Sequence, residues 1–440
     1  MSPNINEDVT RRDFIKTSAV AGATTVLTGS LSHRAHAQGS DTIKVGVVGC
    51  GGRGIFAGIS DCAQSAPGVE VHAIGDLFKE RIDTVAGRFK QSCEKRKLDF
   101  NKIYQVTPAT MFHGWNAYQQ VINSDVDMVI FTSPPYFRPE QLRACVAAGK
   151  HAFVEKPIAV DPVGVRFFLE QSELAKQKGL TIVAGTQMRR ASHLRALMPR
   201  LHDGAIGTIH AGQSARLGGD LVGHLPDKLR KAEWSDMEWQ IRRWLFYTWL
   251  SGDFIVEQHV HNLDLINWAM DAHPTQCTAL GGRQTRTGPT LGNIYDHFTM
   301  QYDYPNGARV IHLARQQGGC SGANSMSLQG PKGTVNFDFG GAKIIGENAW
   351  EYKGPRVSPA IQEYTEMIAA IRNNQPLNDG QQVAETTMTA ILGRISAYTG
   401  RAVKWNWVMK SSKLDLSPPQ LAFGPVPERP VAMPGTTKLI

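Results

Sequence analysis

Short apolar runs alternate with amphipathic stretches between about residues 42 and 185. Such runs are typical of strands buried on both faces of a parallel sheet. The stretches between them have helical spacing, except at residues 101–114, which we expect to form an irregular insertion. The alternation predicts an α/β domain with a doubly wound parallel sheet. The predicted strands are residues 43–48, 69–74, 128–132, 151–154 and 180–184, and the predicted helices include 117–123, 140–148 and 162–177.

The pattern changes after residue 187 to a series of β segments joined by turns such as Pro305-Asn306-Gly307. Such a series predicts a large, mostly antiparallel open sheet. Three helical stretches, 253–270, 359–373 and 381–399, interrupt or follow it. The predicted β segments are residues 206–217, 275–280, 297–304, 308–315, 325–329, 334–339 and 343–345.

These patterns predict four regions. Residues 1–37 precede the fold, 41–185 form a Rossmann nucleotide-binding domain, and 186–400 form an α+β domain. The last region, 401–440, is rich in proline, and we expect it to lie extended on the body or on a neighbouring subunit.

A glycine-rich fingerprint follows the first predicted strand. Its first glycine permits a tight turn, its second lets the backbone approach a pyrophosphate, and its third allows close helix–strand packing. Asp76, at the end of the second strand, is placed to bind a ribose diol, which favours NAD. Lys79 and Arg81 nearby could tolerate a 2′-phosphate, so NADP stays possible. The fingerprint is Gly49-Cys50-Gly51-Gly52-Arg53-Gly54.

The N-terminal sequence predicts a targeting segment. Arg11-Arg12 is followed by Phe14 and Lys16, then by a weakly apolar stretch over residues 17–31 and a small-residue cleavage site ending at Ala37. The stretch is too short and too rich in Gly, Ala and Thr for stable membrane insertion. The alternative is a basic N-terminus with a chance arginine pair.

A twin-arginine signal implies the export machinery as a partner and a periplasmic location for the mature chain. This route carries folded proteins, so a cofactor can be loaded before export. Free nicotinamide nucleotide cannot be relied on outside the cytoplasm. We therefore predict a tightly bound cofactor.

Composition excludes one partner class. The formal charge is +8, but the basic residues are scattered and form no basic stripe with interleaved aromatics, so nucleic acid is not a predicted partner. The six cysteines lack zinc spacing, and most are expected to be buried apolar residues rather than disulfides.

Polar residues follow two of the predicted strands at the sheet edge where ligands bind. Thr132, Ser133 and Pro134 follow one strand, and Glu155 and Lys156 follow the next. Because Lys156 precedes a proline, it is held extended at the edge of the sheet, where it could bind a substrate hydroxyl. The alternative is a surface lysine at a strand end.

The helical stretch 253–270 carries the remaining candidates. Glu257, His261 and Asp264 fall on one stripe of a continuous helix, where the carboxylates could raise the basicity of His261. The alternative is a polar helix edge. A metal site that includes His259 is disfavoured, because His259 and His261 diverge on a helix.

The fingerprint, Thr132-Ser133-Pro134, Glu155-Lys156-Pro157 and the acid-x-x-x-His pattern, in this order, resemble the Gfo/Idh/MocA family over residues 43–400. The resemblance implies that Lys156 contacts the reacting hydroxyl and the nicotinamide ribose, that His261 is the acid/base, and that Glu257 occupies the family's acidic position. It also implies that residues 186–400 serve substrate binding and oligomerisation, with a cleft that has Gln187 on the cofactor side, and that the protein is a homodimer or homotetramer. The residues expected to bind substrate are Arg189, Arg190, His259 and Asp264.

The resemblance implies an NAD(P)-dependent oxidoreductase that transfers a hydride between a sugar or polyol hydroxyl and the nicotinamide. A second hypothesis is a glycoside-cleaving enzyme that oxidises the sugar transiently and eliminates the aglycone. A third is a sugar-binding protein without catalysis. We expect no metal.

Overall fold

The first sheet is parallel and contains six strands in the order β3-β2-β1-β4-β5-β6. The computed structural model describes residues 41–221, 230–288 and 290–440. The predicted signal segment, residues 1–37, lies outside these ranges. All five predicted strands are present, which confirms the doubly wound α/β prediction. The strands are β1 (Ile43–Val48), β2 (Val69–Asp76), β3 (Met111–His113), β4 (Met128–Phe131), β5 (His151–Val154) and β6 (Ile182–Ala184).

The prediction of an irregular insertion at residues 101–114 is wrong. This segment contains the end of α4 (Phe100–Ile103), a short 3-10 turn (Pro108–Thr110) and β3. Strand β3 pairs in parallel with the end of β2, where Asp76 lies opposite His113. A strand of three residues is too short for an apolar period to be visible in the sequence.

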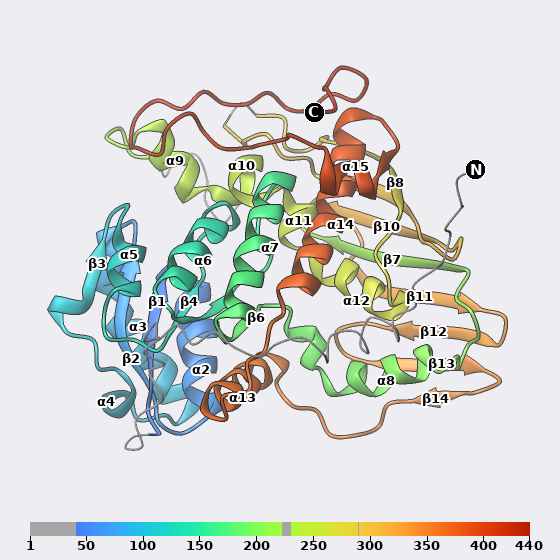
Figure 1. Cartoon of the computed structure of the whole chain (residues 1–440). Helices are drawn as coiled ribbons and strands as arrows, with labels where there is room; N and C mark the ends of the chain where they lie inside the picture. The colour runs from blue at the N-terminus through green and yellow to red at the C-terminus, as the bar shows by residue number, and fades with distance from the viewer. Residues whose placement is uncertain (1–40, 222–229, 289) are drawn as a thin grey trace, which may run out of the picture. The chain divides into compact units, whose positions relative to one another are not determined.

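Different helices cover the two faces of this sheet (Figure 1). Alternate strand residues enter separate cores, so Val47 packs with one set of helices and Val48 with the other. One face carries α5 (Ala117–Ile122), α6 (Arg138–Ala147) and α7 (Pro162–Gln177). The other carries the π-helical segment η1 (Arg53–Ile59), α2 (Ser60–Ser65), α3 (Lys79–Arg96) and α13 (Pro359–Arg372).

Helix α13 belongs by sequence to the predicted second domain, yet it packs on the first sheet. Tyr364 stacks on Phe153 of β5 with ring centroids 4.3 Å apart. Met367, Ile368 and Ile371 join the same buried cluster. The chain therefore returns to its nucleotide-binding half after strand β14, and it adds the last strand of the second sheet, β15, only later.

The second sheet has nine strands in the order β14-β13-β12-β11-β7-β10-β9-β8-β15. Only β7 and β10 pair in parallel, so the prediction of a mostly antiparallel sheet is confirmed. The strands are β7 (Ala211–Gly218), β8 (Gln276–Gly282), β9 (His297–Asp303), β10 (Arg309–Gln316), β11 (Ala323–Gly330), β12 (Gly333–Phe337), β13 (Ala342–Gly346), β14 (Trp350–Glu351) and β15 (Val403–Lys404).

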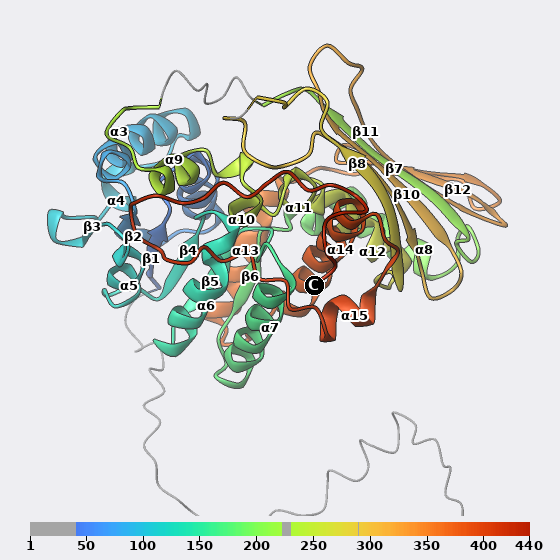
Figure 2. The same cartoon turned by 90° about the horizontal axis from the view of Figure 1, so that it is seen from above.

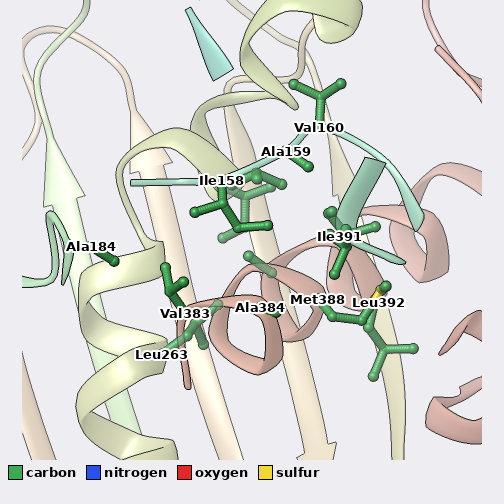
Figure 3. Packing of buried hydrophobic residues seen from close by; sticks show 14 of the residues in the cluster. Ile158, Ala159, Val160, Ala184, Leu263, Val383, Ala384, Met388, Ile391 and Leu392 are labelled. Carbon is green, nitrogen blue, oxygen red and sulfur yellow. The ribbon is translucent and has the colours of Figure 1, made fainter. Parts of the chain in front are cut away.

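Helices lie against one face of this sheet (Figure 2). Helix α14 carries Val383, Met388 and Leu392 into the apolar core, where Leu263 of α12 also packs (Figure 3). No helix in the described ranges combines the length and apolarity of a membrane span. The remaining helices are α8 (Ser192–His202), α9 (Asp236–Arg242), α10 (Thr248–Ser251), α11 (Phe254–Glu257), α12 (Val260–Met270), α14 (Gly380–Thr399) and α15 (Trp405–Lys410).

The predicted continuous helix 253–270 is interrupted between α11 and α12. At the break, Arg216 of β7 donates from Nη1 to the carbonyl oxygen of Gln258 at 2.7 Å. A side chain that enters a helical hydrogen-bond ladder is a recognised cause of such breaks. Glu257 and His261 therefore lie on different helical segments.

Candidate active site

The glycine-rich loop between β1 and η1 is crowded at both ends and open in the middle. A Cβ at Gly49, whose φ is +96°, would lie 2.7 Å from the amide nitrogen of Ser133. A Cβ at Gly54 would lie 2.0 Å from the carbonyl oxygen of Gly49. At Gly52 it would meet nothing within 4 Å. The loop thus leaves its backbone accessible where a pyrophosphate would lie.

We expect Gly51→Ala to weaken NAD binding at least about tenfold, which corresponds to roughly 1.4 kcal/mol. The new methyl group would meet only the end of Arg81, 3.2 Å away, so the fold should accept it. It would occupy space that the pyrophosphate needs. Fluorescence titration with NAD measures the effect. Gly87→Ala, whose Cβ has open space, is the control; equal affinity in both variants would contradict the assignment.

Asp76 ties the end of β2 to this loop. Its carboxylate accepts hydrogen bonds from the amides of Cys50 at 2.7 Å and Phe78 at 2.9 Å. Burial raises the pKa of Asp76, and the charge of Arg81 opposes that shift. Asp76 and Arg81 both line the cavity above the loop, where a ribose would bind.

The cavity has a volume of about 810 Å³, at the upper end of the range for small-molecule sites. The sequence-predicted positions on its wall are Gly49, Gly51, Gly52, Arg53, Gly54, Asp76, Arg81, Thr132, Ser133 and Pro134. These residues therefore fit a dinucleotide. Glu155, Lys156 and Gln187 are outside this wall, and their cofactor contacts stay predictions.

The C-terminal tail forms part of the cavity wall, as Asp415, Ser417 and Leu421 line it. The ring of Phe423 lies 5.2 Å from that of Trp115 and 6.3 Å from that of Phe78. In Figure 1 the tail passes α9, and the amide of Met237 in that helix donates to Gly424. The tail lies on the body of its own chain, in line with one of the two predicted locations.

Lys156 follows β5 and contacts the second half of the chain. Its Nζ donates to the carbonyl oxygen of Glu257 at 2.7 Å and lies 3.1 Å from Glu257 Oε1. Burial lowers the pKa of Lys156, while Glu257 and Glu155 oppose the shift. Glu155 forms an ion pair with Arg53 of the loop at 2.5 Å. This chain of contacts connects Lys156 to the nucleotide loop.

His261 lies in the first turn of α12 and is 8% exposed. Burial lowers the pKa of His261 well below its ordinary value, and the charges of Lys156, Arg216 and Arg53 lower it further. Because Lys156 Nζ contacts the carbonyl oxygen of Glu257, four residues before His261, its ammonium lies near the start of α12, whose first turn carries the imidazole. In the described ranges no hydrogen bond reaches the His261 ring, whose nearest aromatic contact is Phe339, with centroids 6.1 Å apart.

The prediction that carboxylates raise the basicity of His261 is wrong. Glu257 turns to Lys156, and Asp264 forms an ion pair with Arg189 at 2.9 Å. Asp264 also accepts from Gln382 and Thr386. The helix break places Glu257 on a different helical segment from His261. The carboxylate of Asp264 is already paired with Arg189. The charges that act on the imidazole are cations.

The remaining predicted substrate residues have partners within the protein. Arg190 is buried and paired with Asp379 at 2.7 Å. His259 is 1% exposed, and its Nδ1 lies 2.8 Å from Nε2 of His312. Arg189 stacks over Trp268. Their substrate contacts stay predictions, which the burial of Arg190 and His259 does not favour.

Sequence reasoning missed Arg216, Asn262 and Asn324, which surround the helix break. Arg216 and Asn324 occupy facing positions on β7 and β11. A polar side chain on the inner face of a strand was a usable signal, but only once the strand register was known. The described residues contain no group of three His, Cys, Asp or Glu side chains that could hold a metal.

The chain has a dinucleotide-sized cavity at the carboxyl ends of parallel strands, a half-buried lysine from its first half and a buried imidazole from its second. These features are typical of two-domain nicotinamide oxidoreductases. Residues 43–186 match the oxidoreductase family model with an NAD-binding Rossmann fold. Residues 194–336 match the GFO/IDH/MocA C-terminal domain. The chain belongs to the Gfo/Idh/MocA family of NAD-dependent oxidoreductases.

The N-terminal prediction is also confirmed, as residues 8–28 match a twin-arginine translocation signal. This signal indicates export by that pathway.

Two curated relatives show what the chain is similar to. The 2,7-anhydro-N-acetylneuraminate hydratase of Escherichia coli is 26% identical over 217 residues, 49% of this chain and 52% of that protein. A glycosyl hydrolase family 109 protein of Streptomyces coelicolor is 25% identical over 320 residues, 70% of this chain and 61% of that protein. The matches thus span only half to three fifths of these relatives.

A solved structure supports the fold. The scyllo-inositol dehydrogenase of Lactobacillus casei, with bound NAD(H) and scyllo-inositol, superimposes with a TM-score of 0.60. The identity is 17%, and the match covers 82% of this chain and 99% of that one.

Proposed function

We propose that this enzyme oxidises a hydroxyl group of a sugar or polyol, or reduces the corresponding carbonyl, with NAD held in the cavity. The observation that carries the proposal is that Lys156, which follows β5, donates through Nζ to the carbonyl oxygen of Glu257, four residues before His261, while the adjacent Glu155 pairs with Arg53 of the glycine-rich loop. The relatives named for sugar chemistry favour a carbohydrate over other alcohols.

The fit of the cofactor rests on the open middle of the loop and the carboxylate of Asp76. Gly51–Gly54 would hold the pyrophosphate and Asp76 the adenosine ribose, which favours NAD over NADP. When bound, NAD would accept the substrate's hydride on its nicotinamide ring.

The side chains supply the remaining chemistry. Neutral His261 would accept the hydroxyl proton at a ring nitrogen, and the substrate oxygen would become a carbonyl oxygen as the hydride leaves the same carbon for the nicotinamide. Lys156 would exchange its bond to Glu257 for one to that oxygen and stabilise the developing charge. Glu257 would then hold the ammonium between turnovers. In the reverse direction, His261 returns the proton.

The test is turnover with a panel of sugars and polyols in the presence of NAD. Appearance of the near-ultraviolet absorbance of reduced nicotinamide with any of them supports the proposal. If no sugar or polyol produces this absorbance while NAD is demonstrably bound, the hypothesis of a sugar-binding protein without catalysis is favoured instead.

A second candidate, glycoside cleavage by transient oxidation, is favoured by the similarity to a glycosyl hydrolase family 109 protein over 70% of this chain. Nitrophenyl glycosides without added nucleotide separate the two. Aglycone release, with no lasting change in nicotinamide absorbance, identifies cleavage. A lasting absorbance change without aglycone release identifies the dehydrogenase.

We further propose that the cofactor stays bound after export to the periplasm, because the tail encloses it. Phe423 packs against Trp115 and Phe78 on the cavity wall. The end of the tail is held where Ser412 Oγ donates to the carbonyl oxygen of Ile440 at 2.6 Å.

We expect Phe423→Ala to accelerate release of bound NADH about fivefold, because an aromatic contact of this kind contributes roughly 1 kcal/mol. Removal of residues 415–440 should accelerate it more. Decay of NADH fluorescence after dilution into excess unlabelled NAD gives the rate. Met433→Ala is the matched control, because Met433 is 62% exposed on the same tail. Unchanged release from both the Phe423 variant and the shortened chain would contradict retention by the tail.

We propose a homodimer or homotetramer formed through the outer face of the nine-stranded sheet. That face carries Leu280, Ile311 and Ile345, which are 74%, 41% and 51% exposed.

A further inference from the structure

Arg216 projects from the inner face of the second sheet toward the helix break. On β7 it lies opposite Ala314 of β10 and Asn324 of β11. Its Nη1 donates to the carbonyl oxygen of Gln258, the residue between Glu257 and His259. Its guanidinium carbon lies 5.5 Å from the centroid of Phe339, the ring that also contacts His261. Arg216 therefore shares the surroundings of the proposed acid/base.

The hydrogen bond to Gln258 leaves one edge of the guanidinium unused. Arg216 is half-buried, and in the described ranges neither its Nε nor its Nη2 has a hydrogen-bond partner and no carboxylate forms an ion pair with it, so both nitrogens stay accessible. These two nitrogens form the side edge of the guanidinium, whose parallel N–H groups match the two oxygens of a carboxylate.

The nearby charges leave Arg216 as the excess cation. Arg53 is paired with Glu155, and Lys156 with Glu257. Glu257 is the one acidic group among the described residues whose charge acts on Arg216, and it already holds Lys156. A partly buried cation without its own counter-ion is stabilised when a ligand brings a negative charge.

A second observation also points to a ligand beside Arg216. Asn262 is fully buried, and its Oδ1 has no hydrogen-bond partner. Its Nδ2 donates to Oδ1 of Asn324 at 3.0 Å. Because Asn324 lies opposite Arg216 across the strand pair, the unsatisfied amide and the free guanidinium edge belong to one polar cluster. Unsatisfied buried polar atoms are rare unless a ligand or water completes them.

We infer that Arg216 binds a carboxylate on the substrate, so that the enzyme acts on a sugar acid rather than a neutral sugar. This inference rests on the proposed function, because it places the substrate at Lys156 and His261. Through its Nε and Nη2 edge, Arg216 fixes the carboxylate end of the substrate. Asn324, which is half-buried and accepts a hydrogen bond from the buried Asn262, binds a sugar hydroxyl. Lys156 and His261 act on the hydroxyl that reacts.

Calorimetry on the NAD-loaded protein tests the inference. The probes are the sugar acids glucuronate, galacturonate, gluconate and N-acetylneuraminate, with glucose, galactose and glucose 6-phosphate for comparison. We expect at least one sugar acid to bind about 100-fold more tightly than the neutral sugars, the upper range for a hydrogen-bonded charge pair. Arg216→Gln should reduce this preference to about threefold or less, and Arg216→Lys should restore part of it.

Arg309→Gln is the matched control, because Arg309 is 71% exposed on the neighbouring strand β10. Tighter binding of neutral sugars, a preference for the sugar phosphate, or the same preference in the parent and Arg216→Gln would overturn the inference. Sugar-acid binding without turnover would overturn the proposed function and leave the carboxylate site intact. Turnover of neutral sugars without any preference for sugar acids would overturn the carboxylate site and leave the proposed function intact.

Discussion

Lys156→Ala should lower kcat about 1,000-fold, within the range expected when a donor to a developing oxyanion is lost. Nζ of Lys156 contacts Glu257, in the segment that leads to His261, and Lys156 does not line the nucleotide cavity. Affinity for NAD should therefore change little. Initial rates at saturating substrate give kcat, and fluorescence titration gives the NAD affinity.

The matched control is Lys176→Ala, which removes an exposed lysine from α7. Lys156→Arg tests whether positive charge alone is sufficient, because arginine keeps the charge but replaces the compact ammonium with a planar guanidinium. Turnover of Lys156→Ala within about tenfold of the parent would contradict the assigned role, since loss of such a donor costs at least about 100-fold.

His261→Asn should lower kcat about 1,000-fold, the middle of the range for loss of a general acid/base. Asparagine keeps a polar group in the first turn of α12 but cannot accept a proton near neutral pH. A comparable loss in His273→Asn, the matched control in the turn after α12, would indicate damage to the fold instead.

The pH profile provides a second readout for His261. The base works when neutral, and its pKa in the free enzyme is lowered by burial and by Lys156, Arg216 and Arg53. The acid limb of kcat/KM should therefore lie below pH 6.5, the ordinary imidazole value, with a plateau above it. Removing a cation in Arg216→Gln should move this limb to higher pH. An acid limb above pH 6.5 in the parent would contradict the assignment.

The sequence was sufficient where function depends on local backbone geometry. Glycines at 49, 51 and 54 follow a buried strand, and the turn they permit is a property of those few residues. Lys156 was found for the same reason, because strand β5 and the following proline fix its position at the edge of the sheet.

The features that escaped prediction depend on contacts between distant parts of the chain. Helical periodicity over residues 253–270 gave no sign of the break, because Arg216 makes the bond at Gln258 from a strand 42 residues earlier. Because the helix is interrupted, Glu257 pairs with Lys156 instead of His261. The charges that shift the pKa of His261 are therefore cations and not the predicted carboxylates.

The contributions of α13 and of the C-terminal tail to the nucleotide-binding domain were not predicted for a similar reason. Helix α13 covers the first sheet although eight strands of the second sheet precede it in sequence, and Tyr364 packs on Phe153 only in the folded chain. The proline-rich tail was expected to be extended, but no local pattern indicates that Leu421 lines the cavity and Phe423 packs on its wall.

The most direct test of the account is a single turnover followed by near-ultraviolet absorbance on protein loaded with NAD. The parent, Lys156→Ala and His261→Asn are each mixed with the sugar or sugar acid that binds most tightly, with no free nucleotide present. We predict rapid formation of reduced nicotinamide in the parent and formation at least about 100-fold slower in both variants, with the nucleotide still bound. Reduction at the parental rate in either variant would contradict the claim that Lys156 and His261 act together on one substrate hydroxyl.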